Sequence, residues 1–189
     1  QITREEKDVV GYLTFESTAP INPNGNPVIG VSSAGGGWAV CELDGDILMD
    51  GPGDSRAISF GNLDGDIYEE FAVGVGGGLD VYDSWDPNSE NFPLLHDLGS
   101  GGNLVMDVQF GNIDGDVYDE IATGLYSSGC NNNDRYRLYD QDFSVLQSHD
   151  SCPWVNPQCK DHQVTSVDFG KWGSTTNAYY RGNRNYCMS

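Results

Sequence analysis

The sequence predicts an all-β protein built from repeated four-stranded units, and three observations support this. Turn-forming residues are abundant, with 25 glycines among 189 residues. Short segments alternate between apolar and polar residues, as strands with one buried face do. One phrase occurs twice, as FGNLDGDIYEE at 60–70 and as FGNIDGDVYDE at 110–120. Repetition of this kind predicts an array of similar sheets within one domain, 1–189.

The repeated unit is about fifty residues long, a length typical of repeat architectures. Phe60 and Phe110 occupy the same place in the two clear copies, a weaker copy places Phe169 there, and an upstream segment offers Phe15. We therefore expect four approximate units, at 9–50, 56–98, 105–151 and 163–189.

The first two units each contain four candidate strands separated by turn residues. In the second unit they are RAISFGN, FAVGVGGG, LDVYD and FPLLHD. The corresponding segments of the first unit are VVGYLTF, PVIGVSS, WAVCE and ILMD. The first strand alternates, the second is apolar, the third ends in an aromatic and an acid, and the fourth closes the unit.

The third unit follows the same order, with VMDVQFGN, IATGLYSSG, YRLYD and FSVLQSHD. The fourth unit retains VTSVDFGK and is partial. Four-stranded sheets repeating at this length are typical of β-propeller blades. We expect a propeller-like array of about four blades, the last one partial or closed by the N-terminal segment. A β-sandwich with coincidental internal similarity is the alternative.

The repeated acidic loop predicts a calcium site. Oxygen-bearing side chains stand at loop positions one, three, five and nine, and a backbone carbonyl is available at position seven. Ca²⁺ takes six to eight oxygen ligands, whereas Mg²⁺ demands a tight octahedron and fits less well. Gly65 and Gly115 allow the loops to turn, while Leu63 and Ile113 are expected to point into the sheet. The candidate ligands for about two calcium ions are Asn62, Asp64, Asp66, Tyr68 and Glu70, and Asn112, Asp114, Asp116, Tyr118 and Glu120.

These loops resemble the FG-GAP/VCBS repeats of integrin α-subunit propellers and of many secreted proteins. The resemblance rests on FGNLDGDIYEEFAVG and FGNIDGDVYDEIATG. It implies a calcium-binding β-propeller and the same ligand positions, with Tyr68 and Tyr118 acting through their carbonyl groups. The chain departs from the family pattern because asparagine replaces the first aspartate, and Ile67 or Val117 replaces the second glycine. A solvated acidic turn is the alternative interpretation.

Two further segments resemble the acidic loop but are not expected to bind calcium. LDGD at 43–46 falls between the third and fourth strands of the first unit, where Asp44 and Gly45 suit a tight hairpin turn. In the last unit, Lys171 and Trp172 stand where ligands would be required. We expect neither segment to bind calcium.

Charge and cysteine content indicate the environment of the protein. The net charge of −20 disfavours nucleic acid and anionic membranes as partners. No apolar run reaches the roughly twenty residues of a membrane helix, so membrane insertion is not expected. The chain opens on Gln1, which we interpret as a processed, mature form. Crowded cysteines indicate disulfides and an extracellular location, with Cys41 left over. The disulfide candidates are Cys130, Cys152, Cys159 and Cys187.

No phosphate-binding, serine-hydrolase or zinc-protease motif is present, and we expect a non-enzymatic protein. His96-Asp97 recurs as His149-Asp150, which favours a structural role at strand ends. The expected function is adhesion or recognition of a protein or glycan ligand. One alternative is a structural subunit of an extracellular filament or coat, assembled as a homo-oligomer. Another is a lectin, for which the candidate sugar-stacking residues are Trp38, Trp85, Trp154, Trp172, Tyr136, Tyr179 and Tyr180.

Overall fold

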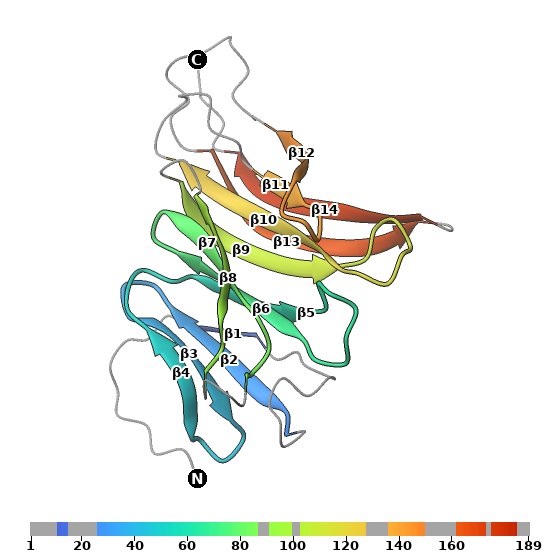
Figure 1. Cartoon of the computed structure of the whole chain (residues 1–189). Helices are drawn as coiled ribbons and strands as arrows, with labels where there is room; N and C mark the ends of the chain where they lie inside the picture. The colour runs from blue at the N-terminus through green and yellow to red at the C-terminus, as the bar shows by residue number, and fades with distance from the viewer. Residues whose placement is uncertain are drawn as a thin grey trace.

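A computed structural model describes residues 11–14, 26–86, 91–99, 103–127, 136–149, 162–172 and 175–184. Within these ranges the chain forms fourteen strands and no helix (Figure 1). Accordingly, the described residues contain no helix of the length and apolarity that a membrane crossing requires. The all-β prediction is confirmed.

The first sheet contains strands β1 (Gly11–Thr14), β2 (Val28–Ser33), β3 (Gly37–Glu42) and β4 (Ile47–Gly51). They pair antiparallel in chain order, as consecutive short strands joined by tight connections do. The 43–46 segment forms the turn between β3 and β4, with the Gly45 backbone N–H bonded to the carbonyl of the residue at the end of β3. The φ angle of this glycine is 101°, so the predicted hairpin turn is confirmed.

The second sheet has the same layout. It consists of β5 (Ala57–Gly61), β6 (Glu70–Val75), β7 (Gly78–Tyr82) and β8 (Leu94–Gly99), again paired antiparallel in chain order. Strand β6 lies inside the sheet and the stack, and five of its six residues are buried. The acidic loop 62–69 joins β5 to β6.

The third sheet repeats this order with β9 (Leu104–Gly111), β10 (Glu120–Ser127), β11 (Tyr136–Tyr139) and β12 (Val145–His149). Strand β10 pairs with both β9 and β11. The second acidic loop, 112–119, therefore joins the same two strands of this sheet as loop 62–69 joins in the preceding one.

The last unit is a hairpin of β13 (His162–Trp172) and β14 (Thr175–Arg184). Two pairs at the end of β10, formed with Gln163 and His162, connect it to the third sheet. Among the described residues β1 pairs with β2 and β14 with β13, and no pairing joins the two ends of the array. The expected closure by the N-terminal segment is thus not seen there. Lys171 and Trp172 belong to β13 itself.

The sheets stack face to face, and each contact between neighbouring sheets forms its own apolar core (Figure 1). Trp38 and Val40 of the first sheet pack on Phe60 and Phe71 of the second. Leu79 and Val81 of the second sheet share a cluster with Val108 and Ile121 of the third. A third cluster joins the third sheet to β13. This burial, worth about 25 cal/mol per Å² of apolar surface, makes each sheet depend on its neighbours.

The phenylalanine–glycine pair that opens the repeated phrase serves this stacking. A Cβ atom at Gly61 would clash with Phe110 of the next sheet, and one at Gly111 would clash with Phe169. Each phenylalanine ring therefore lies against the glycine of the preceding unit. Because any side chain there would separate the sheets, the pair recurs with the unit. The architecture is a propeller-like array of three four-stranded blades followed by the β13–β14 hairpin, within the residues that the structure describes.

Candidate metal centre

The first acidic loop is coiled by hydrogen bonds between near neighbours. The Asn62 side-chain oxygen accepts from the Gly65 backbone N–H at 2.6 Å, and its amide nitrogen donates to the Asp66 carbonyl at 2.5 Å. Asp64 accepts from the Asp66 N–H at 2.9 Å, and Asp66 from the Tyr68 N–H at 2.6 Å. Asparagine and aspartate side chains form such local turns readily. Gly65 closes the loop with a φ of 81°.

The second loop repeats this network bond for bond. Asn112 accepts from the Gly115 N–H at 2.7 Å, Asp114 from the Asp116 N–H at 3.0 Å, and Asp116 from the Tyr118 N–H at 2.8 Å. Gly115 has a φ of 89°. Two loops of the same sequence pattern thus have the same local conformation.

A buried glutamate closes each loop. Glu70 begins β6, Glu120 begins β10, and both side chains are 0% exposed. One carboxylate oxygen of Glu70 accepts from the Leu63 N–H at 2.5 Å, and one of Glu120 accepts from the Ile113 N–H at 2.6 Å. The other oxygen of each glutamate is buried without a hydrogen-bond partner in the structure. A buried carboxylate oxygen without a partner is costly, so its environment requires a compensating cation or proton.

Further carboxylates converge on each glutamate. Oxygen atoms of Asp64, Glu70 and Asp83 lie within 4.8 Å of one another, as do oxygen atoms of Asp114, Asp116 and Glu120. These six acids come from two blades and from three segments of the chain: the first loop, the residue after β7, and the second loop. Five of the ten predicted ligands belong to these two groups, and Asp66 stands outside the first one.

Asp83 was not among the predicted ligands. It directly follows β7, and packing of β7 beside β6 brings it to the loop. The available signal in the sequence was the acid that ends LDVYD, repeated as Asp140 in YRLYD. Asp140 acts on Glu120 electrostatically but is not part of the second group.

The two glutamates have strongly raised pKa values. Burial, together with the charges of Asp64, Asp83 and Asp66, raises the pKa of Glu70 to about 8 against the Leu63 hydrogen bond, which lowers it. Burial and the charges of three aspartates likewise raise the pKa of Glu120 to about 7, opposed by the Ile113 hydrogen bond. Both shifts reflect carboxylates gathered out of water without positive charge, which a bound cation would supply.

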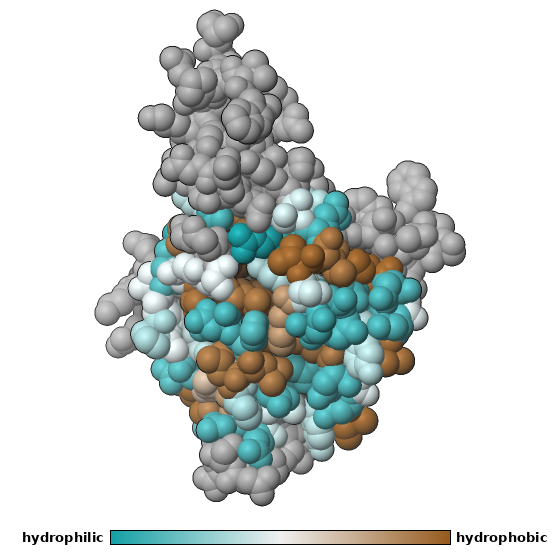
Figure 2. Space-filling model, turned by 45° about the horizontal axis from the view of Figure 1, so that its top comes forward, coloured by the Kyte–Doolittle hydropathy of each residue, from teal (hydrophilic) through white to brown (hydrophobic). Residues whose placement is uncertain are grey.

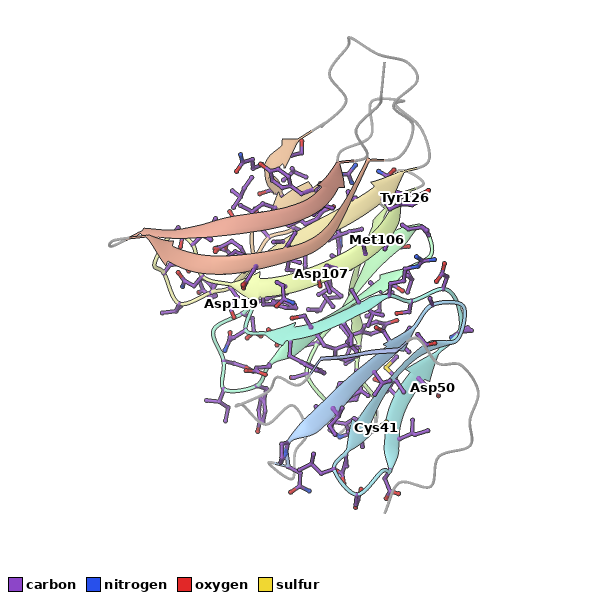
Figure 3. The ribbon with its side chains drawn as sticks, turned by 180° about the vertical axis from the view of Figure 1, so that it is seen from behind. Cys41, Asp50, Met106, Asp107, Asp119 and Tyr126 are labelled. Atoms are coloured by element: carbon purple, nitrogen blue, oxygen red, sulfur yellow. The ribbon has the colours of Figure 1, made fainter. Side chains whose placement is uncertain are left out.

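The remaining predicted positions have simpler roles. Leu63 is buried and Ile113 packs against the core, as expected. Cys41 is a free, half-buried thiol on β3, and β3 pairs with β4, the strand that contains Asp50 (Figure 3). Burial raises the pKa of the Cys41 thiol. The four disulfide candidates lie outside the described residues. His96 stacks on Phe143 of the next blade at 4.6 Å.

Two of the tryptophans proposed for sugar stacking are packing residues. Trp38 is only 6% exposed and lies in the core between the first two sheets, so it is not available for sugar stacking. Trp85 packs edge-on against Phe92. The side chains of Trp154, Trp172, Tyr179 and Tyr180 lie outside the described part of the chain.

A separate hollow of about 610 Å³ lies between the first and second sheets. Its lining includes Trp38, Tyr82, Asp50 and Asp80. The hollow shares no residue with either acidic loop or with the two carboxylate groups.

Comparison with known proteins gives limited similarity. No protein-family model matches the chain, and no curated protein matches it. Among solved structures, the chain is similar to one described as "Structure of Dos1 propeller", with 17% sequence identity and a TM-score of 0.47. The match covers 92% of this chain and 50% of that one, so the chain spans about half the length of the propeller that it matches.

Proposed function

We propose that this chain is a calcium-stabilised β-propeller module that acts outside the cell in adhesion or in recognition of a protein or glycan, without enzymatic activity. The observation that carries the proposal is the buried glutamate of each loop. Glu70 and Glu120 each present an unpartnered oxygen to neighbouring carboxylates, in the same register of two blades.

Calcium fits this donor set on chemical grounds. The donors are all hard oxygens, and Ca²⁺ accepts six to eight of them in a flexible arrangement. In the first loop Asp64, Glu70 and Asp83 would supply carboxylates, with Asn62, Asp66 and the Tyr68 carbonyl nearby. In the second loop Asp114, Asp116 and Glu120 would do so, with Asn112 and the Tyr118 carbonyl. A divalent ion would neutralise charges that otherwise repel one another.

The proposed role of calcium is structural. Each candidate site joins the end of a blade's first strand to the start of its second, next to the surface where adjacent blades stack. A ligand that binds only the folded chain stabilises it by mass action. This arrangement supports the resemblance to FG-GAP/VCBS repeats, whose calcium sites lie in equivalent loops.

The extracellular setting is proposed from composition. A net charge of −20 suits a calcium-rich medium, and five cysteines suit an oxidising one. Disulfide pairing among Cys130, Cys152, Cys159 and Cys187 belongs to the same proposal.

A filament or coat subunit is a second candidate function, favoured by one observation. The outer strands carry exposed apolar side chains: Leu94 and Leu95 on β8 are 54% and 41% exposed, and Val145 and Leu146 on β12 are 53% and 49% exposed. Apolar patches separated by polar residues are visible on the surface (Figure 2). Exposed outer strands can pair with another chain. Light scattering after size-exclusion chromatography, with and without reductant, measures this assembly.

Native mass spectrometry of the purified chain in calcium tests the main proposal. We expect two bound ions in the original chain and one in each of the variants Asp64→Ala and Asp114→Ala. Asp44→Ala is the matched control, since its LDGD turn has no buried glutamate behind it, and this variant should keep both ions. A chain that binds no calcium, or variants that both retain two ions, would overturn the proposal.

A further inference from the structure

We propose that the two acidic loops form one coupled calcium-binding unit, and that Asp119 is the positioning residue that couples them. This inference rests on the proposed calcium sites and adds to them a dependence of each site on the other. It follows from contacts that cross from the third blade to the second.

Asp119 holds the first residue of the neighbouring loop by two hydrogen bonds. Its carboxylate accepts from the Asn62 backbone N–H at 2.9 Å, and its own backbone N–H donates to the Asn62 carbonyl at 2.7 Å. Asp119 lies at the strand ends of the third blade, where loop 112–119 approaches the second blade (Figure 3). Both backbone groups of Asn62 are therefore fixed by the next blade and not by its own.

Two packing contacts reinforce this link. A Cβ atom at Gly65 would lie 2.9 Å from the Tyr118 ring, so the turn of the first loop rests on an aromatic side chain of the second. Leu63 is buried in a cluster that includes Val108 and Ile121 of the third blade. The back of the first loop is thus formed by the second loop and its blade.

These contacts place Asp119 between the two sets of candidate ligands. It stands directly between Tyr118, whose carbonyl is a candidate ligand, and Glu120, which closes the second site. In the first loop, the side chain of Asn62 forms hydrogen bonds with the backbone of Gly65 and Asp66 and so holds that loop in its coiled conformation. Closing the second loop around an ion fixes Asp119 and with it Asn62, so the first loop reaches its binding conformation with less loss of entropy.

A calcium titration by calorimetry of the original chain and of the single-site variants tests the coupling. We expect the first site to bind calcium about fivefold or more weakly in Asp114→Ala than in the original chain. Linkage requires Asp64→Ala to weaken the second site by the same factor. Equal affinities in the original chain and the variants, or tighter binding in the variants from relief of repulsion between two cations, would overturn the inference.

Substitution of Asp119 shows whether this residue carries the coupling. The single variant Asp119→Ala should still bind two ions. Adding Asp114→Ala to this variant should leave the calcium affinity of the first site unchanged. Asp119→Asn is the matched control, because its amide oxygen can still accept from Asn62, and it should keep the coupling. Because Asp119→Ala removes the carboxylate bond and keeps the backbone bond to Asn62, coupling that survives in this variant would exclude the Asp119 side chain as its carrier. Two ions bound without coupling would refute this inference while leaving the proposed sites intact, whereas no bound ion would refute both.

Discussion

The two acidic loops have nearly the same sequence and the same internal hydrogen bonds, but different surroundings. Loop 62–69 gathers Asp83 from a neighbouring strand, while the corresponding Asp140 stays outside the second group. Loop 62–69 also forms a hydrogen bond to the next blade, from the Asn62 backbone N–H to the Asp119 carboxylate. Burial is the main cause that raises the pKa of Glu70 to about 8 and that of Glu120 to about 7, and neighbouring aspartate charges add to both shifts.

This difference separates what a repeat encodes from what its position adds. Bonds within a loop join residues two to seven positions apart, so each copy forms them alone. The contributions of Asp83 and Asp119 come from other strands and blades. Repeated sites in a stacked array therefore share a local geometry and differ in charge and support.

Removal of calcium should have the largest effect, because it removes what both loops share. At free calcium 100 times the dissociation constant, each site contributes about 2.7 kcal/mol to the free energy of unfolding. We expect chelation to lower the melting temperature by about 5–10 °C for each site, measured by calorimetry. Magnesium added at the same concentration as calcium should restore a smaller part of the lost melting temperature. A melting temperature that does not change on chelation would contradict a structural role for calcium.

The pH dependence of the calcium-free chain should distinguish the two loops. The pKa values of Glu70 and Glu120 are raised in the folded state above the ordinary 4.5, so the folded chain binds more protons than the unfolded chain above that pH. Their stabilising contribution is complete below about pH 4.5 and is lost as pH rises, by up to about 1.4 kcal/mol per pH unit for each glutamate.

The loss should end near pH 7 for Glu120 and near pH 8 for Glu70. Urea unfolding between pH 5 and 8 of Glu70→Gln and Glu120→Gln measures each contribution separately. Glu120→Gln, which keeps Glu70, should lose more stability between pH 7 and 8 than Glu70→Gln, which keeps Glu120. Identical profiles for the two variants would show that the loops are electrostatically equivalent.

The glycines beneath the phenylalanine rings offer a comparison that does not involve calcium. Gly61→Ala and Gly111→Ala each place a methyl group against the ring of the next unit, and overpacking of this kind costs typically about 1–3 kcal/mol. Urea unfolding measures the loss. Gly99→Ala is the control, since a Cβ there meets open space and should change stability little. Equal effects in all three variants would argue against the stacking role.

Asp83 should produce the smallest effect and the most specific one. Because it contributes one carboxylate to the first group only, Asp83→Asn should weaken calcium binding at the first site on the order of tenfold. Asp140→Asn should change the second site much less. Calorimetric titration of both variants measures the difference, and equal losses would mean that the two sites have equivalent ligand sets.

Much of the site was predictable from sequence because its framework is local. Turn chemistry at Asn62, Gly65 and their counterparts follows from residue type and spacing, and alternation identifies the flanking strands. Asp83 was not predictable as a member of the group, since it lies beyond a further strand and only the pairing of β7 with β6 brings it there. Whether Trp38 stacks on sugar or packs in a core could not be decided from the sequence, because a single aromatic residue in a strand does not reveal which sheet covers it.

By itself, the sequence determined the strand order, the hairpin turns and the coiled acidic loops, since each of these depends on residues close together in the chain. Only the tertiary structure decided which blade supports which loop. The bonds from Asp119 to Asn62 and the ring of Phe110 over Gly61 join residues about fifty positions apart. Such contacts exist because stacking of the sheets buries apolar surface, and no local preference specifies the neighbour against which a sheet will pack.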